Sequence, residues 1–404
     1  MTKSKRPLYF ALLTALASVP FVFGFSEPNL IGPAIRQFGQ KMDTVLEKPG
    51  ENTIFSPWNI GTLLGLAGEG ARGDTELAFW ELLGLPSSGD KAGFKEAIHT
   101  LNVHGPMQLS NGVGLWLQSG MLFNPLFQQT AVDVFNGQLA QVNFKEHPDD
   151  ARKEINHWIS LKTHGKIPDL LKPGSVKKDT KVVLASTLYM NAPFLFPFSL
   201  SNSHRDTFTP SNGKEFPITF MQQTSNLNYY EDDFVQIVEI PYKSNPLDVV
   251  LWILLPKGDV RPIDVDTYGP HLLAARVDLK IPKMEVRSSY DLKKPLQALG
   301  FVLPFTMAAD FTGMVAGQVE LTDIIHEAYM SWDEKGTEAA AATGTVFTTT
   351  RYMPEEKIIP FHANRPFSFL IWEKSTGIPL FQGHIDTPKP FLGRTDLTDN
   401  LLDD

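Results

Sequence analysis

Cysteine is absent from this chain of 404 residues, which excludes a disulfide framework, a catalytic thiolate and a metal site built on cysteine. The acceptor sequence for N-glycosylation, Asn-x-Ser/Thr, is absent as well. The formal net charge is −9, and basic residues form no run longer than a few positions. We therefore expect no nucleic-acid partner, because nucleic-acid-binding proteins gather lysine and arginine into a patch or stripe.

The sequence also lacks the common signatures of catalysis. The patterns GxSxG, HExxH and GxxxxGK(S/T) do not occur, so no nucleophile elbow, zinc-protease helix or phosphate loop is expected. GEGARG, residues 68–73, fits the dinucleotide pattern GxGxxG. A helix-like segment precedes it where that site needs a strand, so we interpret it as a turn that ends a helix. His157 and His164 have no further ligands nearby to complete a zinc site. These absences favour a protein that is not an enzyme and uses no metal or cofactor.

The first residues have the pattern of a secretory signal peptide. A basic segment, MTKSKRP, precedes the apolar run LYFALLTALASVPFVFGF, and we predict a cleaved signal peptide over residues 1–24. An uncleaved anchor is the alternative, because the run is just long enough to span a bilayer, but Pro20 interrupts it. After cleavage we expect a soluble, secreted protein with no membrane contact. The lack of cysteine and glycan acceptors favours export by a bacterium.

Helical patterns come early in the chain and strand patterns come late, which predicts an α+β protein. Apolar residues recur at helical spacing in residues 29–46 and 75–85. Residues 180–190 and 248–258 are nearly continuous apolar runs, typical of strands buried on both faces. Residues 366–385 predict two strands joined by a turn. The acidic residues 389–404 predict a loosely attached tail.

One segment has a middle of unusually small and nearly uncharged residues. Residues 333–354 read DEKGTEAAAATGTVFTTTRYMP. A helix there would have under two turns, too few to persist without tertiary support. As a strand, its side chains alternate, with Thr337 on a small, uncharged face and Glu338 on the other. A strand of such small residues can enter a packed sheet without displacing much volume. A flexible linker is the alternative, but strand-like runs flank the segment.

Several segments in order resemble the serpin family. Residues 326–344, HEAYMSWDEKGTEAAAATG, closely resemble the hinge of the serpin reactive loop. Residues 361–388 resemble the C-terminal signature, and residues 52–76 and 155–171 resemble two further stretches. The resemblance implies one α+β domain over residues 27–388, with three β-sheets and eight to nine helices. It also implies an exposed reactive-centre loop at about residues 334–354.

The resemblance further implies suicide inhibition of a protease. A serine protease, or a cysteine protease, would attack the loop and be trapped as an acyl-enzyme when the cleaved loop inserts into the main sheet. A monomer without cofactors is expected, and a non-inhibitory serpin with a binding or chaperone-like role is the alternative. The hinge implied by the family pattern comprises Glu334, Gly336, Thr337, Glu338, Ala339, Ala340, Ala341, Ala342 and Thr343.

Two bonds are candidates for the cleavage. Counting from Glu334 by the commonest family spacing predicts the bond Thr350-Arg351, which suits an elastase-like or subtilisin-like protease. A loop longer by one residue predicts Arg351-Tyr352, which suits a trypsin-like protease with a buried carboxylate in its pocket.

The sequence departs from the family where the sheet must open. Ser56 and His326 match the hydrogen-bonded cluster called the shutter, but Asn59 stands where serine is usual and Ser186 where asparagine is usual. We expect these two side chains to keep a mutual hydrogen bond with donor and acceptor exchanged. Phe194 replaces a usual tryptophan in the breach, at the top of the sheet, which removes an indole N–H.

Overall fold

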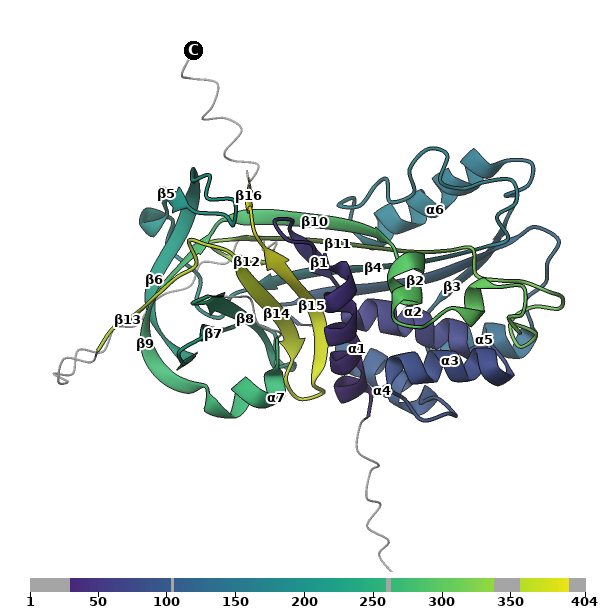
Figure 1. Ribbon diagram of the computed structural model, residues 1–404, viewed down its shortest axis with the longest axis horizontal. Coiled ribbons are helices and arrows are strands. Elements are labelled where there is room, and N and C mark those ends of the chain that lie inside the picture. Colours follow the sequence, from purple (N-terminus) through teal and green to yellow (C-terminus); the bar gives the residue numbers. More distant parts are fainter. Residues whose placement is uncertain (1–29, 103–104, 259–262, 338–356, 392–404) are drawn as a thin grey trace, which may run out of the picture.

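The computed structural model describes residues 30–102, 105–258, 263–337 and 357–391 (Figure 1). Within them lie eight α-helices: α1 Ile31–Leu46, α2 Pro57–Glu69, α3 Gly73–Leu83, α4 Lys91–Leu101, α5 Pro125–Asp133, α6 Pro148–Lys162, α7 Val265–Tyr268 and α8 Lys293–Ala298. Three short 3-10 helices are η1 Leu200–Asn202, η2 Gly269–His271 and η3 Leu303–Phe305.

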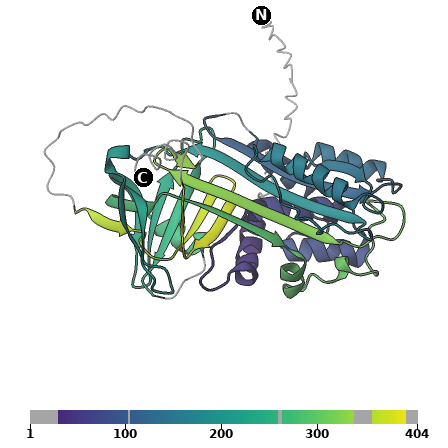
Figure 2. The same cartoon turned by 90° about the horizontal axis from the view of Figure 1, so that it is seen from above.

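A seven-stranded sheet of long strands runs along the molecule (Figure 2). Its strands, in spatial order, are β16 Lys389–Pro390, β10 Met284–Asp291, β11 Asp323–Asp333, β12 Gly336–Thr337, β4 Val182–Pro193, β2 Gln108–Gln118 and β3 Gln138–Val142. β4 and β11 pair in parallel with each other, and the two-residue strand β12 pairs antiparallel with both.

The remaining nine strands form a second hydrogen-bonded network. They are β1 Thr53–Phe55, β5 His204–Phe208, β6 Phe216–Glu231, β7 Val235–Pro241, β8 Val249–Pro256, β9 Leu273–Pro282, β13 Ile359–His362, β14 Phe367–Glu373 and β15 Ile378–Ile385. The expected three sheets therefore appear as two networks among the described strands. The reason is that β6 pairs with β5 and β9 along most of its length and with β7 at its end, which joins two of the expected sheets.

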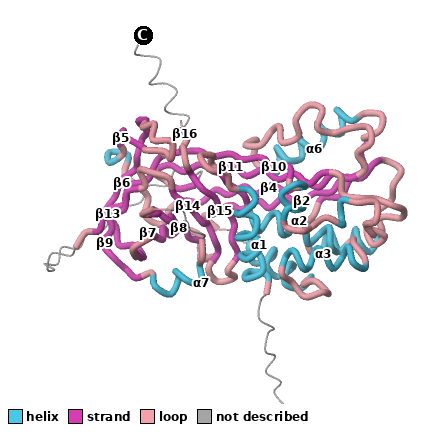
Figure 3. The backbone as a smooth tube through the Cα atoms, viewed as in Figure 1, coloured by secondary structure: helices cyan, strands magenta, loops and turns pink. Residues whose placement is uncertain are grey.

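Helices cover the two faces of the seven-stranded sheet unequally. α1 to α5 gather on one side, and α6 crosses the other side alone (Figures 1 and 3). Ile155 and Ile159 of α6 belong to a separate apolar cluster with Trp116 of β2 and Val183 of β4. α2 is buried at every residue except Glu69, because it lies between the two sheets and packs against β2, β4 and β15.

The predicted elements are confirmed where the structure describes them. The strands β4 and β8 are buried on both faces for nearly their whole length. α2 ends at Glu69 and α3 begins at Gly73, so GEGARG is a turn between helices. A side chain at Gly68 would collide with Phe79 and Trp80 of α3. The glycine therefore allows two helices to approach, and no nucleotide is needed to explain it.

The expected signal peptide and most of the expected tail lie outside the described residues. Within the part of the chain that the structure describes, no helix is long and apolar enough to cross a membrane, and no three metal-ligating side chains gather. His157 and His164 are exposed. Lys389 and Pro390 pair with β10, so the predicted tail begins as an edge strand of the main sheet.

Candidate functional site

The seam between the parallel strands β4 and β11 is only partly closed. Residues 323–328 of β11 pair with residues 183–188 of β4. Beyond this ladder, β12 lies between the two strands, with Thr337 opposite Trp332 and Ala192. The direct ladder between β11 and β4 therefore covers only residues 323–328 and 183–188, and at Trp332 and Ala192 the strand β12 stands between them. At the top of the sheet, two residues of the hinge therefore already separate β4 from β11.

Gly336 occupies a position that only glycine fits. Its φ of 152° is positive, a backbone conformation that is essentially restricted to glycine. A Cβ atom there would lie 2.3 Å from the carbonyl oxygen of Ala192 and 2.6 Å from Cα of Pro193. The close approach of β12 to β4 therefore depends on the missing side chain.

Thr337 and Glu334 anchor the two sides of this glycine. Thr337 is buried, and its Oγ1 lies 2.6 Å from the hydroxyl of Tyr242. Glu334 is also buried, accepts a hydrogen bond of 2.8 Å from the Ser203 hydroxyl and forms an ion pair with Lys283. The burial of Thr337 agrees with its assignment to the small, inward face. Glu338, the next residue, and the rest of the loop to residue 354 lie outside the described residues.

Phe194 closes the breach by aromatic packing. It is buried and stacks on Tyr242, with ring centroids 5.2 Å apart, and its backbone N–H donates to the carbonyl of Lys335 at 2.8 Å. The tryptophan usual in the family would offer an indole N–H here. In this chain the backbone N–H of Phe194 and the Tyr242 hydroxyl make polar contacts to the hinge at this point.

A buried histidine joins the seam to helix α2 lower in the sheet. Nε2 of His326 accepts a hydrogen bond of 3.0 Å from the backbone N–H of Ser56. That assigns the ring proton to Nδ1, which donates to Ser186 Oγ at 3.0 Å. Burial lowers the pKa of His326 to about 3, so the imidazole is neutral at pH 7. It holds β11, β4 and the start of α2 together.

The profile of the serpin (serine protease inhibitor) family matches residues 34–388. The chain belongs to the serpin family. Serpins are non-enzymatic inhibitors or binding proteins, which agrees with the absence of catalytic signatures from the sequence.

Relatives of this serpin come from distant organisms. It is 30% identical over 369 residues to an uncharacterized serpin-like protein of Thermococcus kodakarensis, covering 88% of this chain and 85% of that protein. It is also 30% identical over 366 residues to the leukocyte elastase inhibitor of Bos taurus, covering 84% and 94%.

The solved structures show the same fold. Serpin48 of the insect Tenebrio molitor is 27% identical with a TM-score of 0.78, covering 90% of this chain and 100% of that chain. Thyroxine-binding globulin in complex with thyroxine has a TM-score of 0.79 at 24% identity, covering 89% and 99%. This second likeness shows the fold alone.

The expected bond between Asn59 and Ser186 is not made in this serpin. Asn59 instead donates its Nδ2 to Oδ1 of Asn111 at 2.6 Å and to the carbonyl of Gly112 at 3.2 Å. Ser186 hydrogen-bonds His326. Asparagine at position 59 and serine at position 186 do not restore the bond that the family makes. The longer side chain of Asn59 starts from α2 and reaches past β4 to the next strand, β2. Asn59 therefore ties α2 to β2, a connection that the sequence did not reveal.

On the face of the main sheet that α6 covers, a buried carboxylate is stabilised by an ion pair. Glu327 of β11 is fully buried and pairs with Arg287 of β10, which also binds Asp169 at 2.9 Å. Burial raises the pKa of Glu327. Asp169 follows α6, so this network fastens the segment after α6 to the sheet. No local pattern predicts it, since the three residues come from distant parts of the chain.

The buried imidazole makes stability depend on pH. Below pH 6.5 the unfolded chain protonates His326 while the folded chain does not until about pH 3, so the free energy of unfolding falls as pH falls. The slope is at most about 1.4 kcal/mol per pH unit. His326→Gln should reduce this slope, as measured by urea unfolding from pH 7 to pH 4.

Two comparisons isolate the contribution of His326. Burial raises the pKa of Asp43 to about 6. This makes the free energy of unfolding rise as pH falls, but the effect is the same in the wild type and in His326→Gln. His157 is exposed on α6, so His157→Gln should leave the slope unchanged. An equal slope in wild type and His326→Gln would refute this assignment.

Proposed function

We propose that this serpin is an inhibitor that traps a serine protease as an acyl-enzyme, by inserting its cleaved reactive loop between β4 and β11. One observation carries the proposal: Gly336 and Thr337, two residues near the start of the hinge, already pair with both strands. Insertion would therefore lengthen an existing strand, so the free-energy cost of forming the first pairs of a new strand would not arise.

The register of β12 supports continued insertion. Thr337 lies opposite Trp332 and Ala192, so an antiparallel strand extended by six residues would bring Thr343 opposite His326 and Ser186. Those two residues are partners of each other across the closed seam. The two registers thus agree on one path of insertion, along which the Thr343 hydroxyl would lie beside the shutter histidine.

The alternation of side chains supports the same path. Continuing from the buried Thr337, the residues Ala339, Ala341 and Thr343 would face the core, and Glu338 would face α6. In that register Glu338 lies opposite Ser331, whose buried hydroxyl has no hydrogen-bond partner among the described residues. The inserted carboxylate could accept from that hydroxyl, so the charged residue that follows Thr337 would meet a donor.

A panel of proteases tests the proposal. An elastase-like, a subtilisin-like and a trypsin-like enzyme would each be incubated with the full chain and separated on a denaturing gel. We expect a covalent complex that survives SDS with at least one of them. Complete cleavage of the loop by every enzyme without any such complex would reject inhibition and favour the non-inhibitory alternative.

The same reaction identifies the cleaved bond. We propose Thr350-Arg351, with Arg351-Tyr352 as the alternative, and both bonds lie outside the described residues. Mass spectrometry of the released C-terminal fragment should show Arg351 as its first residue. Arg351→Ala should leave inhibition of an elastase-like protease intact, whereas cleavage after Arg351 predicts that it abolishes inhibition of a trypsin-like protease.

We also propose that a bacterium secretes this protein after removing residues 1–24 as a signal peptide. The proposal rests on the basic and apolar segments at the start of the sequence. N-terminal sequencing of the protein exported from a bacterial host should begin near residue 25. Retention of Met1 in the exported or membrane fraction would contradict it.

A further inference from the structure

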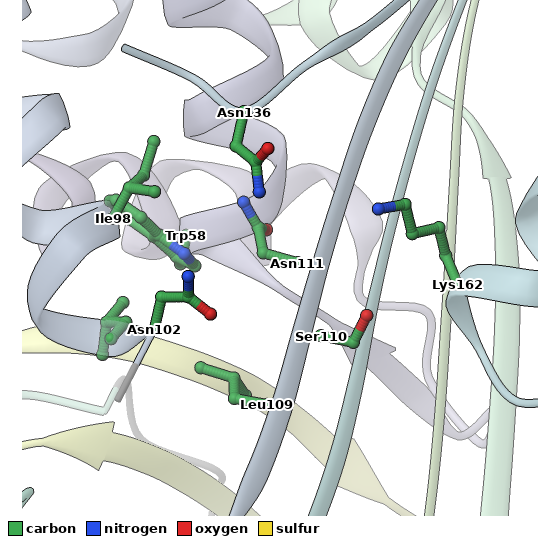
Figure 4. Close-up of a pocket in the computed structure, with 9 residues that line it drawn as sticks. Trp58, Ile98, Asn102, Leu109, Ser110, Asn111, Asn136 and Lys162 are labelled. Carbon is green, nitrogen blue, oxygen red and sulfur yellow. The ribbon is translucent and has the colours of Figure 1, made fainter. Parts of the chain in front are cut away.

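A pocket outside the hinge and the shutter lies between α2, α4, β2 and the end of α6 (Figure 4). Its volume is about 180 Å³. Figure 4 shows the amide groups of Asn102, Asn111 and Asn136 and the ammonium group of Lys162 directed toward a common space. These residues come from four separate parts of the chain, namely the end of α4, β2, the connection between α5 and β3, and the end of α6, so the tertiary structure alone brings them together.

The polar lining is rich in hydrogen-bond donors. Oδ1 of Asn111 is occupied as an acceptor for Asn59, which leaves the Nδ2 group of Asn111 to donate into the pocket. Among the described residues, the side chains of Asn102, Ser110 and Asn136 make no hydrogen bond. Lys162 adds a positive charge, and no carboxylate lines the pocket. A cationic, donor-rich pocket in a protein with a net charge of −9 favours an anionic ligand.

The rest of the lining is apolar. Trp58 and Leu109 face the same space, and Ile98 and Leu101 of α4 complete the wall. The volume is comparable to the ~150 Å³ cavity that holds one benzene molecule. A ligand of this size with an apolar body and one charged end matches both halves of the lining.

We propose that this pocket binds a small organic carboxylate, with its apolar body against Trp58 and Leu109 and its carboxylate on Lys162 and the asparagine amides. None of the residues that line the site belongs to the reactive loop. It belongs to the uncleaved protein and does not depend on inhibition.

The position of the pocket couples it to the opening of the sheet. Separation of β4 from β11 must carry β2 along, because β2 and β4 pair over ten residues, while α2 also packs on β15 of the other sheet. The pocket is lined by α2 and α4 on one side and by β2 on the other. A ligand that contacts both sides would hold them together. This consequence rests on the proposed inhibitory function: the bound carboxylate should oppose loop insertion.

Binding can be measured directly with benzoate and its neutral counterpart benzamide. Both would be titrated into the uncleaved full chain and followed by saturation-transfer difference NMR. We expect the Kd of benzoate to be about five-fold lower than that of benzamide, as one partly exposed ion pair contributes. Lys162→Gln should remove this difference, and Asn136→Gly should weaken benzoate binding. Asn136 has a positive φ of 49°, so glycine fits its backbone.

The control is Lys95→Gln, which removes an exposed lysine from the neighbouring helix α4. It should bind benzoate as the wild type does, and thermal melting should show that all three variants fold. Equal affinity of the wild type for benzoate and benzamide would overturn the proposed site. So would full discrimination between them by a folded Lys162→Gln.

A second experiment, on the cleaved chain, distinguishes failure of the proposed binding site from failure of the proposed inhibitory function. After the loop is cut, a chain whose melting temperature has risen should bind benzoate about five-fold more weakly, because β2 has moved away from α2. Unchanged affinity in such a chain would overturn the coupling. A chain that is cut without a rise in melting temperature would refute loop insertion, while benzoate binding to the uncleaved protein would still support the site.

Discussion

A single cut in the reactive loop is expected to raise the melting temperature of this serpin by about 12 °C. Full insertion would add roughly a dozen ladder hydrogen bonds at ~1 kcal/mol net each, on the order of 10 kcal/mol. For a chain of 404 residues, the entropy of unfolding is about 0.8 kcal/mol per degree, which converts this energy into the expected shift. Thermal unfolding followed by circular dichroism, before and after limited cleavage, measures it directly.

The interpretation depends on cutting the loop and nothing else. Mass spectrometry must show one cut within residues 338–354, and a sample cut in the N-terminal residues 1–29 serves as the control that should melt like the intact protein. An unchanged melting temperature after a clean loop cut would contradict insertion. It would favour the alternative that this serpin is a binding or chaperone-like protein.

The substitution Gly336→Val is expected to convert the inhibitor into a substrate. The new Cβ would overlap the main chain of β4 at Ala192 and Pro193, and the positive φ would be strained for valine. This strain would raise the activation free energy of loop insertion by about 1–3 kcal/mol. Insertion would then be roughly 5- to 150-fold slower relative to hydrolysis of the acyl-enzyme. The number of inhibitor molecules consumed per protease inactivated should rise accordingly, as measured by titration of protease activity.

Lys335→Ala provides the matched control for this substitution. Lys335 is the neighbouring residue and is exposed, so its replacement should leave the titration unchanged. Gly336→Val should also lose most of the rise in melting temperature after cleavage, because β12 can no longer lie against β4. If Gly336→Val inhibited with the stoichiometry of the wild type, β12 would not be the start of insertion.

Local sequence patterns predicted much of the framework around this site. The continuous apolar run of residues 180–190 is a strand buried on both faces, because its composition leaves no polar side to face water. The alternation assigned Thr337 to the inward face, and it is buried. Alternation works here because the period of a strand is fixed by the backbone and needs no knowledge of the partner strands.

The contacts that hold the hinge could not be predicted in this way. The bond between Thr337 and Tyr242 joins residues 95 positions apart, and nothing near Tyr242 in the sequence marks it as a partner. The expected bond between Asn59 and Ser186 was wrong because the position of Asn59 on α2 determines which strand its side chain reaches. Lengths of side chains and distances between elements decide such contacts, and neither is a property of local sequence.

The sequence by itself determined the class of fold, the family resemblance and the small, uncharged character of one face of the hinge. These depend on residue type and period, which the order of amino acids contains directly. The tertiary structure decided how far the hinge has already entered the sheet, which glycine allows it to do so, and which distant segments surround the pocket at Lys162. Those features depend on where the ends of strands and helices meet in space, and only packing of the whole chain sets those positions.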